Sequence, residues 1–395
     1  MEKVISRDVI VIGGDHNNTL AVLRCLAKNN CRVTLVIHSK DIKKNAILKS
    51  KYVKKYEILK DFDEEIITFL RKYEVKNKKT ILFPCSDVAA YTIDYYGDEL
   101  SNKYLIFGFK NNYGKVCKMM DKYEQYLWAN QHGVPIAKTW KMEFENFSKI
   151  QISDILFPCI LKPEISAFGK KSDICIINTQ YEFADRLEDF RMKGYKSVII
   201  QEFIKKEYEI CAFGCIDNTN FHYGIIKKER EYPVEGGGSL TYAKFIKNDK
   251  IKKAVENILF LLKEEEFIGN FDIEFFICGS QILLNEINFR HSGNGVALVK
   301  AGIPAPFISC LSLWHKKVSD YKYFVDDEIY YMNELSELFH VKNRYISIYE
   351  YLKSIYRAHA FTYFDRQDLS GTFGFYRLKL EMIIKKILRM KNEKN

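Results

Sequence analysis

Apolar residues at the start of the chain come in short runs, separated by segments of a different period. The first run ends at Gly13 and Gly14 and is followed by a helical pattern over residues 19–28. A strand, a glycine turn, a helix and a second strand form the unit from which parallel sheets are built. We therefore predict an open parallel α/β domain over residues 1–113. Its expected strands cover residues 8–12, 32–37, 80–84 and 104–109.

The pattern changes beyond residue 113. One helix is predicted over residues 113–131, because Gly133 and Pro135 supply a stop signal. Short strands with glycine-bearing turns follow, which indicates a two-lobed α+β domain over residues 114–315, with a mobile lobe near 140–200. A mixed and then helical extension is expected over residues 316–395. Within the middle domain, the expected strands cover residues 160–163, 174–178, 197–203, 208–215, 271–278 and 281–287, and the helices 181–193 and 250–265.

The composition is typical of a globular protein that binds an anionic ligand. Hydrophobic residues make up 47% and charged residues 28% of the 395 residues, as in folded domains. No signal peptide is visible, and no run reaches the roughly 20 apolar residues of a membrane-spanning helix, so we expect a cytoplasmic protein. The net charge of +10 suits nucleotides. Nucleic acid is not expected, because no compact basic-aromatic module is present, and a homo-oligomer is compatible with the sequence.

The glycine pair at residues 13 and 14 does not predict a dinucleotide site. The segment reads GGDHNN, so Asn17 and Asn18 stand where a GxGxxG motif has a small residue that lets the helix pack on the strand. A structural turn is the favoured interpretation. In this first domain Asp15, Ser86 and Asp87 are only candidates for a substrate pocket.

Two lysines and a loop could hold phosphate groups. Lys122 opens a predicted helix, and Lys162 ends an apolar strand just before a proline. The loop that follows contains Ser166, Gly169 and Lys171, and its small residues allow backbone N–H groups to approach phosphate oxygens. Taken singly, Lys122 could be a solvated helix residue and the loop an ordinary surface turn. A lysine at position 162 needs a polar partner, which favours a functional role.

The end of the strand at residues 197–203 has the features of a nucleoside site. The backbone of residues 201–204, which include Phe203 and Ile204, can bond an adenine edge, with Glu202 accepting from the exocyclic amine. Glu207 suits a ribose diol, because a carboxylate accepts from two hydroxyl groups. The exposed face of an edge strand is an equally good interpretation of Glu207.

The segment LLNEINF gives the sharpest prediction. Glu286 and Asn288 alternate on one strand and share a face, and Glu274 on the preceding strand of a predicted hairpin, turning at Gly279, can face them. Two carboxylates and an amide oxygen suit Mg²⁺ carried by a nucleotide, with Mn²⁺ as an alternative. Arg290 could neutralise a phosphoryl group during transfer. A charge buried beside Leu and Ile is unfavourable without a partner, so a functional role is favoured here.

Taken in order, these pieces resemble the ATP-grasp superfamily, particularly its carbamoyl-phosphate-synthetase-like and amino-acid-ligase-like branches. The resemblance covers residues 5–315. The matching segments are MDK at 120–122, ILKP at 160–163, QEFI at 201–204, EYEI at 207–210, DIEF at 272–275 and NEINFRHSGNG at 285–295.

The resemblance implies roles for these residues. Lys122 and Lys162 would contact the nucleotide, and the loop from Ser166 to Lys171 would cover its phosphates. Residues 202–204 would form the adenine hinge, and Glu207 would bind the ribose. The metal ligands would be Glu274, Glu286 and Asn288, and the phosphate-stabilising arginine would be Arg290. The implied fold is a parallel sheet followed by two α+β lobes that enclose ATP.

One position departs from the family. Asp272 stands where some peptide-type ligases carry an arginine, so stabilisation of an acyl phosphate would come from elsewhere. The segment 227–242, with its lysines, Arg230 and three glycines, is a candidate substitute that could close over substrate. A solvated hairpin tip explains the same segment equally well.

The resemblance implies an ATP-dependent ligase that joins small-molecule carboxylate and amine substrates through an acyl phosphate. Two alternatives are a kinase-like phosphotransferase on the same ATP lobes and a non-catalytic nucleotide-binding protein. An intact set of metal ligands argues against the last.

The end of the chain is an amphipathic basic helix. Leu380, Ile383 and Ile387 share one face over residues 377–394, with lysines on the other. Weak peripheral contact with an anionic membrane is one interpretation. Packing of this helix on the body of the protein is the favoured one.

Overall fold

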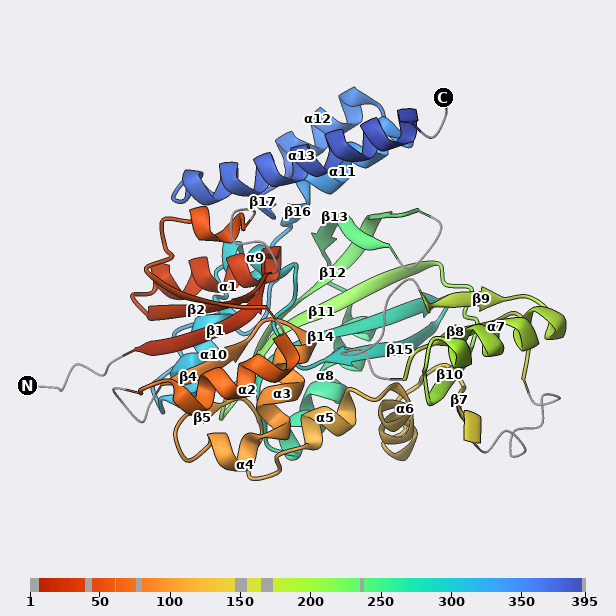
Figure 1. Ribbon diagram of the computed structural model, residues 1–395, viewed down its shortest axis with the longest axis horizontal. Helices are drawn as coiled ribbons and strands as arrows, with labels where there is room; N and C mark the ends of the chain where they lie inside the picture. Colours follow the sequence, from red (N-terminus) through yellow and green to blue (C-terminus); the bar gives the residue numbers. More distant parts are fainter. Residues whose placement is uncertain are drawn as a thin grey trace, which may run out of the picture.

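A five-stranded parallel sheet forms the first part of the computed structural model (Figure 1), which describes residues 7–39, 45–60, 62–75, 80–145, 155–164, 173–234 and 238–392. All pairs in this sheet are parallel, so the predicted open parallel sheet is confirmed. In spatial order its strands are β3 (Lys55–Leu59), β2 (Arg32–His38), β1 (Asp8–Gly14), β4 (Ile81–Pro84) and β5 (Leu105–Ile106).

Helices cover both faces of this sheet. Alternate side chains of β1 point to opposite faces, so Val9 and Val11 pack with helix α1 (Asn17–Lys28), and Ile10 and Ile12 pack with helices α2 (Phe62–Lys72) and α3 (Asp87–Tyr95). The short helices η2 (Ile47–Lys49) and α4 (Gly97–Leu100) complete this part of the chain.

The prediction of one strand at 104–109 is wrong in its second half. Leu105 and Ile106 pair with β4, but β6 (Gly108–Phe109) pairs with a strand of the next sheet. Gly108 has a φ of 141°, a backbone conformation that favours glycine, and the chain changes sheets there. The parallel sheet is thereby tied to the sheet that follows.

A small antiparallel sheet lies at one end of the molecule (Figure 1). Helix α7 (Gln180–Met192) packs on it through Phe183, Leu187 and Phe190, which form a separate core with Leu161. In spatial order its strands are β7 (Thr139–Glu143), β10 (Ser197–Glu202), β8 (Cys159–Lys162) and β9 (Cys175–Ile177).

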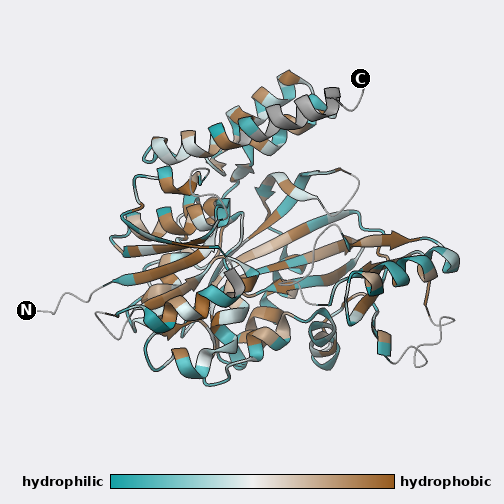
Figure 2. Ribbon diagram, viewed as in Figure 1, coloured by the Kyte–Doolittle hydropathy of each residue, from teal (hydrophilic) through white to brown (hydrophobic). Residues whose placement is uncertain are grey.

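The largest sheet carries the hairpin that the sequence predicts. In spatial order its strands are β15 (Gln281–Asn288), β14 (Phe267–Cys278), β11 (Tyr208–Ile216), β12 (Phe221–Tyr232), β13 (Ser239–Phe245), β16 (Tyr330–Met332) and β17 (Ala360–Phe361), and β6 also pairs with β14. Figure 2 shows hydrophobic residues along its central strands.

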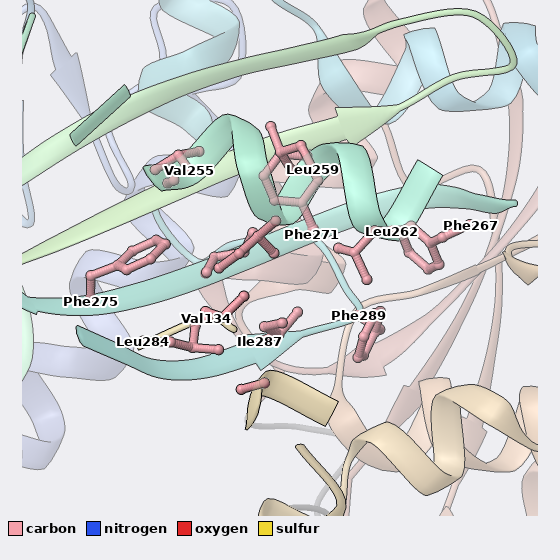
Figure 3. Close-up of a cluster of buried hydrophobic side chains, with 14 of the residues drawn as sticks. Val134, Val255, Leu259, Leu262, Phe267, Phe271, Phe275, Leu284, Ile287 and Phe289 are labelled. Carbon is pink, nitrogen blue, oxygen red and sulfur yellow. The ribbon is translucent and has the colours of Figure 1, made fainter. Parts of the chain in front are cut away.

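The two faces of the large sheet are covered differently. On one face helix α8 (Asp249–Glu264) packs through Val255 and Leu259 against Phe271 and Phe275 (Figure 3). On the other face Phe213 packs with helices α9 (Gly295–Lys300) and α10 (Ala305–Leu313). Residues of β14 and β15 alternate between these faces, so their polar members lie opposite the α8 core.

The single helix predicted over residues 113–131 is in fact two helices. α5 (Lys115–Met119) ends before Asp121, and α6 (Lys122–Gln131) begins after it. Asp121 has an extended backbone, and its carboxylate accepts hydrogen bonds from the N–H groups of Tyr123 (2.7 Å) and Glu124 (3.3 Å). Such an N-cap satisfies donors that have no partner within the helix, and it places Lys122 at the first helical position.

The last part of the chain is mixed and then helical, as predicted. Helices α11 (Glu334–Lys342), α12 (Ile348–Arg357) and α13 (Leu369–Asn392) form a layer over the parallel sheet and the edge of the large sheet (Figure 1). The buried carboxylate of Glu334 accepts from the N–H groups of Thr362, Tyr363 and Phe364. This layer therefore forms an integrated part of the fold.

Candidate functional site

Two carboxylates face each other on neighbouring strands. Glu274 of β14 is the register partner of Glu286 of β15, and Asp272 is the partner of Asn288. A bulge at Asn285 follows, and its side-chain amide donates to Glu274 at 3.3 Å. Bulges commonly redirect side chains beside functional sites. The three metal ligands expected from the sequence thus lie on one paired hairpin.

The two predicted lysines lie close to this pair. Nζ of Lys122 is 3.9 Å from Oε1 of Glu286. Lys162 is buried at the end of β8, where its Nζ donates to Oε1 of Gln201 at 2.9 Å. Burial and the charge of Lys122 lower the pKa of Lys162 to about 8, although Glu286 and Glu274 partly oppose this shift. Lys162 therefore lies within electrostatic range of Lys122, Glu274 and Glu286.

Arg290 continues the hairpin and reaches the parallel sheet. Its Nε donates to Oδ1 of Asp87 at 2.5 Å, and its other nitrogens lie 3.5 Å from Oδ1 of Asn288 and 3.9 Å from Oδ2 of Asp272. Burial would lower the pKa of Arg290, but the charges of Asp87 and Asp272 outweigh it and raise the pKa. This guanidinium is therefore fixed beside the predicted ligands.

Asp272 adds an oxygen that has no hydrogen-bond partner among the described residues. Its Oδ1 is buried, and burial together with the charge of Glu274 raises the pKa of Asp272 to about 7. Carboxylate and amide oxygens are the donors that a hard divalent ion prefers, so the chemistry of this donor set fits such an ion. The described residues contain no cluster of three or more His, Cys, Asp or Glu side chains with metal-binding geometry. The predicted set of Glu274, Glu286 and Asn288 contains only two such side chains, and its role as a ligand set stays a prediction.

The predicted nucleoside site lies where β10 ends. The N–H of Glu202 donates to the carbonyl of Lys138 at 2.9 Å, and the carbonyl of Ile204 accepts from Lys206. Within the described part of the chain, the N–H groups of Phe203 and Ile204 have no hydrogen-bond partner. The exposed carboxylate of Glu207 accepts from the N–H of Gly279 at 2.9 Å, at the turn of the β14–β15 hairpin. Its role in ribose binding stays a prediction.

The predicted phosphate-covering loop falls outside the described residues. Ser166, Gly169 and Lys171 belong to it. The loop begins at Glu164, whose carbonyl accepts from the N–H of Lys122 at 3.1 Å. The small sheet is thereby connected to the start of α6.

A charged cluster at that connection was not anticipated from the sequence. Lys141 of β7 is bonded to Glu164 and lies 4.0 Å from Asp121, and Ser197 also donates to Glu164. Burial and the nearby Glu164 raise the pKa of Asp121 to about 7. The four residues come from separate segments of the chain, so no local sequence pattern predicts the cluster.

The cationic side chains of the segment 227–242 have different partners. It forms the hairpin β12–β13, as one of the two interpretations predicts, with Gly236 and Gly237 outside the described residues. An irregularity at Glu229 turns Lys228 towards Glu209 and Glu274, but Arg230 towards Glu337 of α11 at 2.7 Å. Burial opposes the charge of Lys228, yet the surrounding carboxylates raise its pKa. Lys228 therefore belongs to the site, and Arg230 holds the C-terminal layer.

The substrate-pocket candidates of the first domain have different partners. Asp15 accepts from the N–H groups of Ala46 and Ile47, and Ser86 caps helix α3. Only Asp87 reaches the predicted phosphate site, through Arg290. No helix among the described residues is both long enough and apolar enough to cross a membrane.

Comparisons with known proteins identify the middle of the chain. Residues 127–302 match the family model of the ATP-grasp domain. A formate-dependent phosphoribosylglycinamide formyltransferase from Sulfolobus acidocaldarius is 28% identical over 205 residues, which cover 48% of this chain and 49% of that protein. An N5-carboxyaminoimidazole ribonucleotide synthase from Aquifex aeolicus is 27% identical over 220 residues, covering 53% and 55%. The chain thus aligns with about half the length of these curated relatives.

Solved structures share the fold over most of the chain. N5-carboxyaminoimidazole synthetase from Staphylococcus aureus, complexed with ADP, matches with a TM-score of 0.64 over 87% of both chains at 15% identity. The N5-carboxyaminoimidazole ribonucleotide synthetase of Thermus thermophilus matches with a TM-score of 0.61 over 81% of this chain and 82% of its own, at 13% identity. At such identities the likeness establishes the fold, and it confirms the predicted fold class.

Proposed function

We propose that the chain is an ATP-dependent ligase, on the premise that its residues 127–302 match the ATP-grasp domain. It activates a carboxylate as an acyl phosphate and transfers the acyl group to an amine. One observation carries the proposal: Lys122 and Lys162 converge on Glu274 and Glu286 from separate elements. A metal–nucleotide complex carries both a metal ion and phosphate oxygens. It therefore suits a site with both carboxylates and cations better than a metal ion or a nucleotide alone would.

The chain's own residues hold the nucleotide. Residues 202–204 lie along the adenine and Glu207 near the ribose, with the N–H groups of Phe203 and Ile204 available to the base. Lys122 and Lys162 neutralise phosphate oxygens. The expected phosphate contacts of Ser166, Gly169 and Lys171 are part of the same proposal.

Glu274, Glu286 and Asn288 would hold Mg²⁺, or Mn²⁺, that arrives with ATP. Bound there, the ion would neutralise negative charge on the phosphate oxygens. The other groups act by positioning: Arg290 is fixed by Asp87, and Lys228 by Glu209, so both cations are oriented before substrate arrives.

The proposed reaction has two steps. A carboxylate oxygen attacks the γ-phosphorus, and the bond between that phosphorus and the oxygen of ADP breaks. The amine nitrogen then attacks the acyl carbon, phosphate leaves, and the nitrogen loses a proton to solvent. Charge builds on phosphoryl oxygens in the first step, where Lys162 and Arg290 stabilise it.

The names of the relatives suggest the kind of substrate. One is a formate-dependent formyltransferase of phosphoribosylglycinamide, and another is a synthase of N5-carboxyaminoimidazole ribonucleotide. Both names pair a one-carbon acid group with a nitrogen compound that carries ribose phosphate. Small carboxylates, including formate and bicarbonate, with amines on anionic small molecules are therefore the first substrates to screen.

The test is ADP release from purified protein with panels of carboxylates and amines, with products identified by mass spectrometry. ADP is expected to appear together with an amide, or with a carbamate where bicarbonate is the acid, and Glu286→Gln is expected to lower ADP release at least about a hundredfold, because a metal carboxylate is lost. Glu264→Gln, an exposed position on α8, is the matched control. Normal turnover by Glu286→Gln would overturn the assignment. A stable phosphorylated product formed without any amine would favour a phosphotransferase instead.

A further inference from the structure

Helix α12 exposes an apolar stripe. Ile348, Leu352 and Ile355 follow one another at helical spacing, and Tyr356 lies beside them with 91% of its surface exposed. Ile348 and Leu352 are also exposed, whereas Ser354 on the opposite side is buried and bonded to Arg230. The polar contact faces the protein, and the apolar stripe faces outwards.

Helix α13 carries a second stripe. Leu369, Phe373, Tyr376 and Leu380 recur at intervals of four, three and four residues, so they share one face. Phe373 is 63% exposed, and Leu369 and Leu380 are exposed as well. Phe375 points the other way, into the core of the parallel sheet.

The two stripes border one groove. A cavity of about 390 Å³ is lined by Ile355 of α12, Tyr376 of α13 and Phe364 of the intervening segment. Each stripe contributes one residue to the cavity and continues outwards along its helix. Figure 1 shows both helices in the outer layer of the molecule. The groove and its exposed borders form one apolar surface.

Positive charge surrounds this surface. Residues 341–395 contain twelve Lys and Arg against five Asp and Glu, and so carry +7 of the chain's +10. Over residues 341–378 the exposed Lys, Arg, Asp and Glu side chains are six cations and the single acid Glu350, and the cations are Lys342, Arg344, Lys353, Arg357, Arg366 and Arg377. These cations lie on α12, on α13 and in the segments that flank them, so the exposed part of this layer is positively charged.

We infer that the α12–α13 groove docks the protein on the surface of a membrane rich in anionic phospholipid. Apolar side chains would enter the acyl region, and tyrosines and cations would lie at the headgroups, as in interfacial amphipathic helices. A second copy fits less well, because an isologous contact would bring two cationic surfaces together. Nucleic acid would match the charge but offers no partner for exposed Leu, Ile and Phe side chains.

The test is flotation of the full chain with vesicles of phosphatidylcholine alone or with about 30 mol% phosphatidylserine, a composition chosen because roughly this share of anionic lipid attracts basic surfaces. Binding to the serine-containing vesicles is expected to be at least about tenfold tighter. Leu352→Ser with Phe373→Ser should weaken binding about tenfold or more by removing apolar contacts. Lys353→Glu should also weaken it, and added salt should reverse most of the preference for phosphatidylserine.

Tyr181→Ser is the matched control for Tyr356→Ser, because Tyr181 is 89% exposed on a different helix. Tyr181→Ser should leave vesicle binding unaltered, and Tyr356→Ser should reduce it. Circular dichroism melts identify any variant that has lost its fold. Equal affinity for both kinds of vesicle, or no effect of the groove variants, would overturn the inference. So would concentration-dependent dimers that the groove variants dissociate while lipid binding is absent.

Discussion

Asp87, the first residue of helix α3, holds the guanidinium of Arg290 at 2.5 Å from its carboxylate. The pair joins the parallel sheet to the end of β15. Asp87→Asn keeps the size but removes the charge, so Arg290 should lose its fixed position. We expect kcat to fall about tenfold, which corresponds to a charge-assisted hydrogen bond.

The dissociation constant of ATP should hardly change in this variant, because Asp87 acts only through Arg290. Steady-state kinetics and calorimetry of ATP binding separate the two effects. Glu99→Gln is the control, since Glu99 of α4 pairs with Arg71 of α2 in an exposed ion pair of the same domain. Weaker ATP binding at unchanged kcat would contradict the positioning role.

Glu274 and Glu286 are direct register partners, so they should share one cation. Glu274→Gln removes one charge and leaves one amide oxygen. The concentration of Mg²⁺ that gives half-maximal ATP turnover should rise about tenfold or more. The measurement is a Mg²⁺ titration at fixed ATP, with Glu264→Gln as the reference. An unchanged Mg²⁺ requirement would place the ion elsewhere.

The pKa of Lys162, lowered to about 8 by burial and by Lys122, predicts a pH dependence of nucleotide binding. The amine is charged below this pKa and neutral above it. Affinity for ATP should therefore be highest below the pKa and fall as the pH rises through that value. Binding isotherms between about pH 6.5 and 9.5, a range chosen to bracket a lysine shifted by burial, measure the effect. Adenosine has no phosphates, so its affinity should not follow the same curve.

Local patterns were sufficient for much of the fold and for the arrangement of the hairpin. The alternation in LLNEINF placed Glu286 and Asn288 on one face, because the period of a strand is fixed by its geometry. The sequence pattern placed Lys122 at the start of a helix, but it also predicted one continuous helix over residues 113–131. The separate helix α5 was therefore missed, and the cap geometry at Asp121 shows the two helices.

Contacts between residues far apart in the sequence determine the features of the fold and of the site that local patterns did not predict. Nothing near Lys228 or Arg230 indicates that an irregularity at Glu229 sends them to opposite faces. Strands β16 and β17 each have fewer than four residues; β16 joins the large sheet by pairing with β13, and β17 joins it by pairing with β16. The division into domains at residues 113 and 315, and the roles of the individual site residues, stay predictions.

A buried ion pair anchors the C-terminal layer. Nε of Arg24 on α1 donates to Oδ2 of Asp368 at 2.8 Å, and both side chains are almost fully enclosed. Asp368 also accepts from Ser50 and from the N–H of Lys51. Asp368→Ala would leave the charge of Arg24 buried without this partner. We expect the free energy of unfolding to fall by about 3–5 kcal/mol.

The exposed pair of Arg71 and Glu99 provides the comparison, because it has similar geometry at the surface. Glu99→Ala should change the free energy of unfolding by less than about 1 kcal/mol. Urea unfolding of both variants, followed by tryptophan fluorescence, gives the two values. Trp314 packs in the same core as Phe375 of α13, so its signal reports on the joined units. Equal losses for the two variants would mean that burial of the Arg24–Asp368 pair does not anchor the layer.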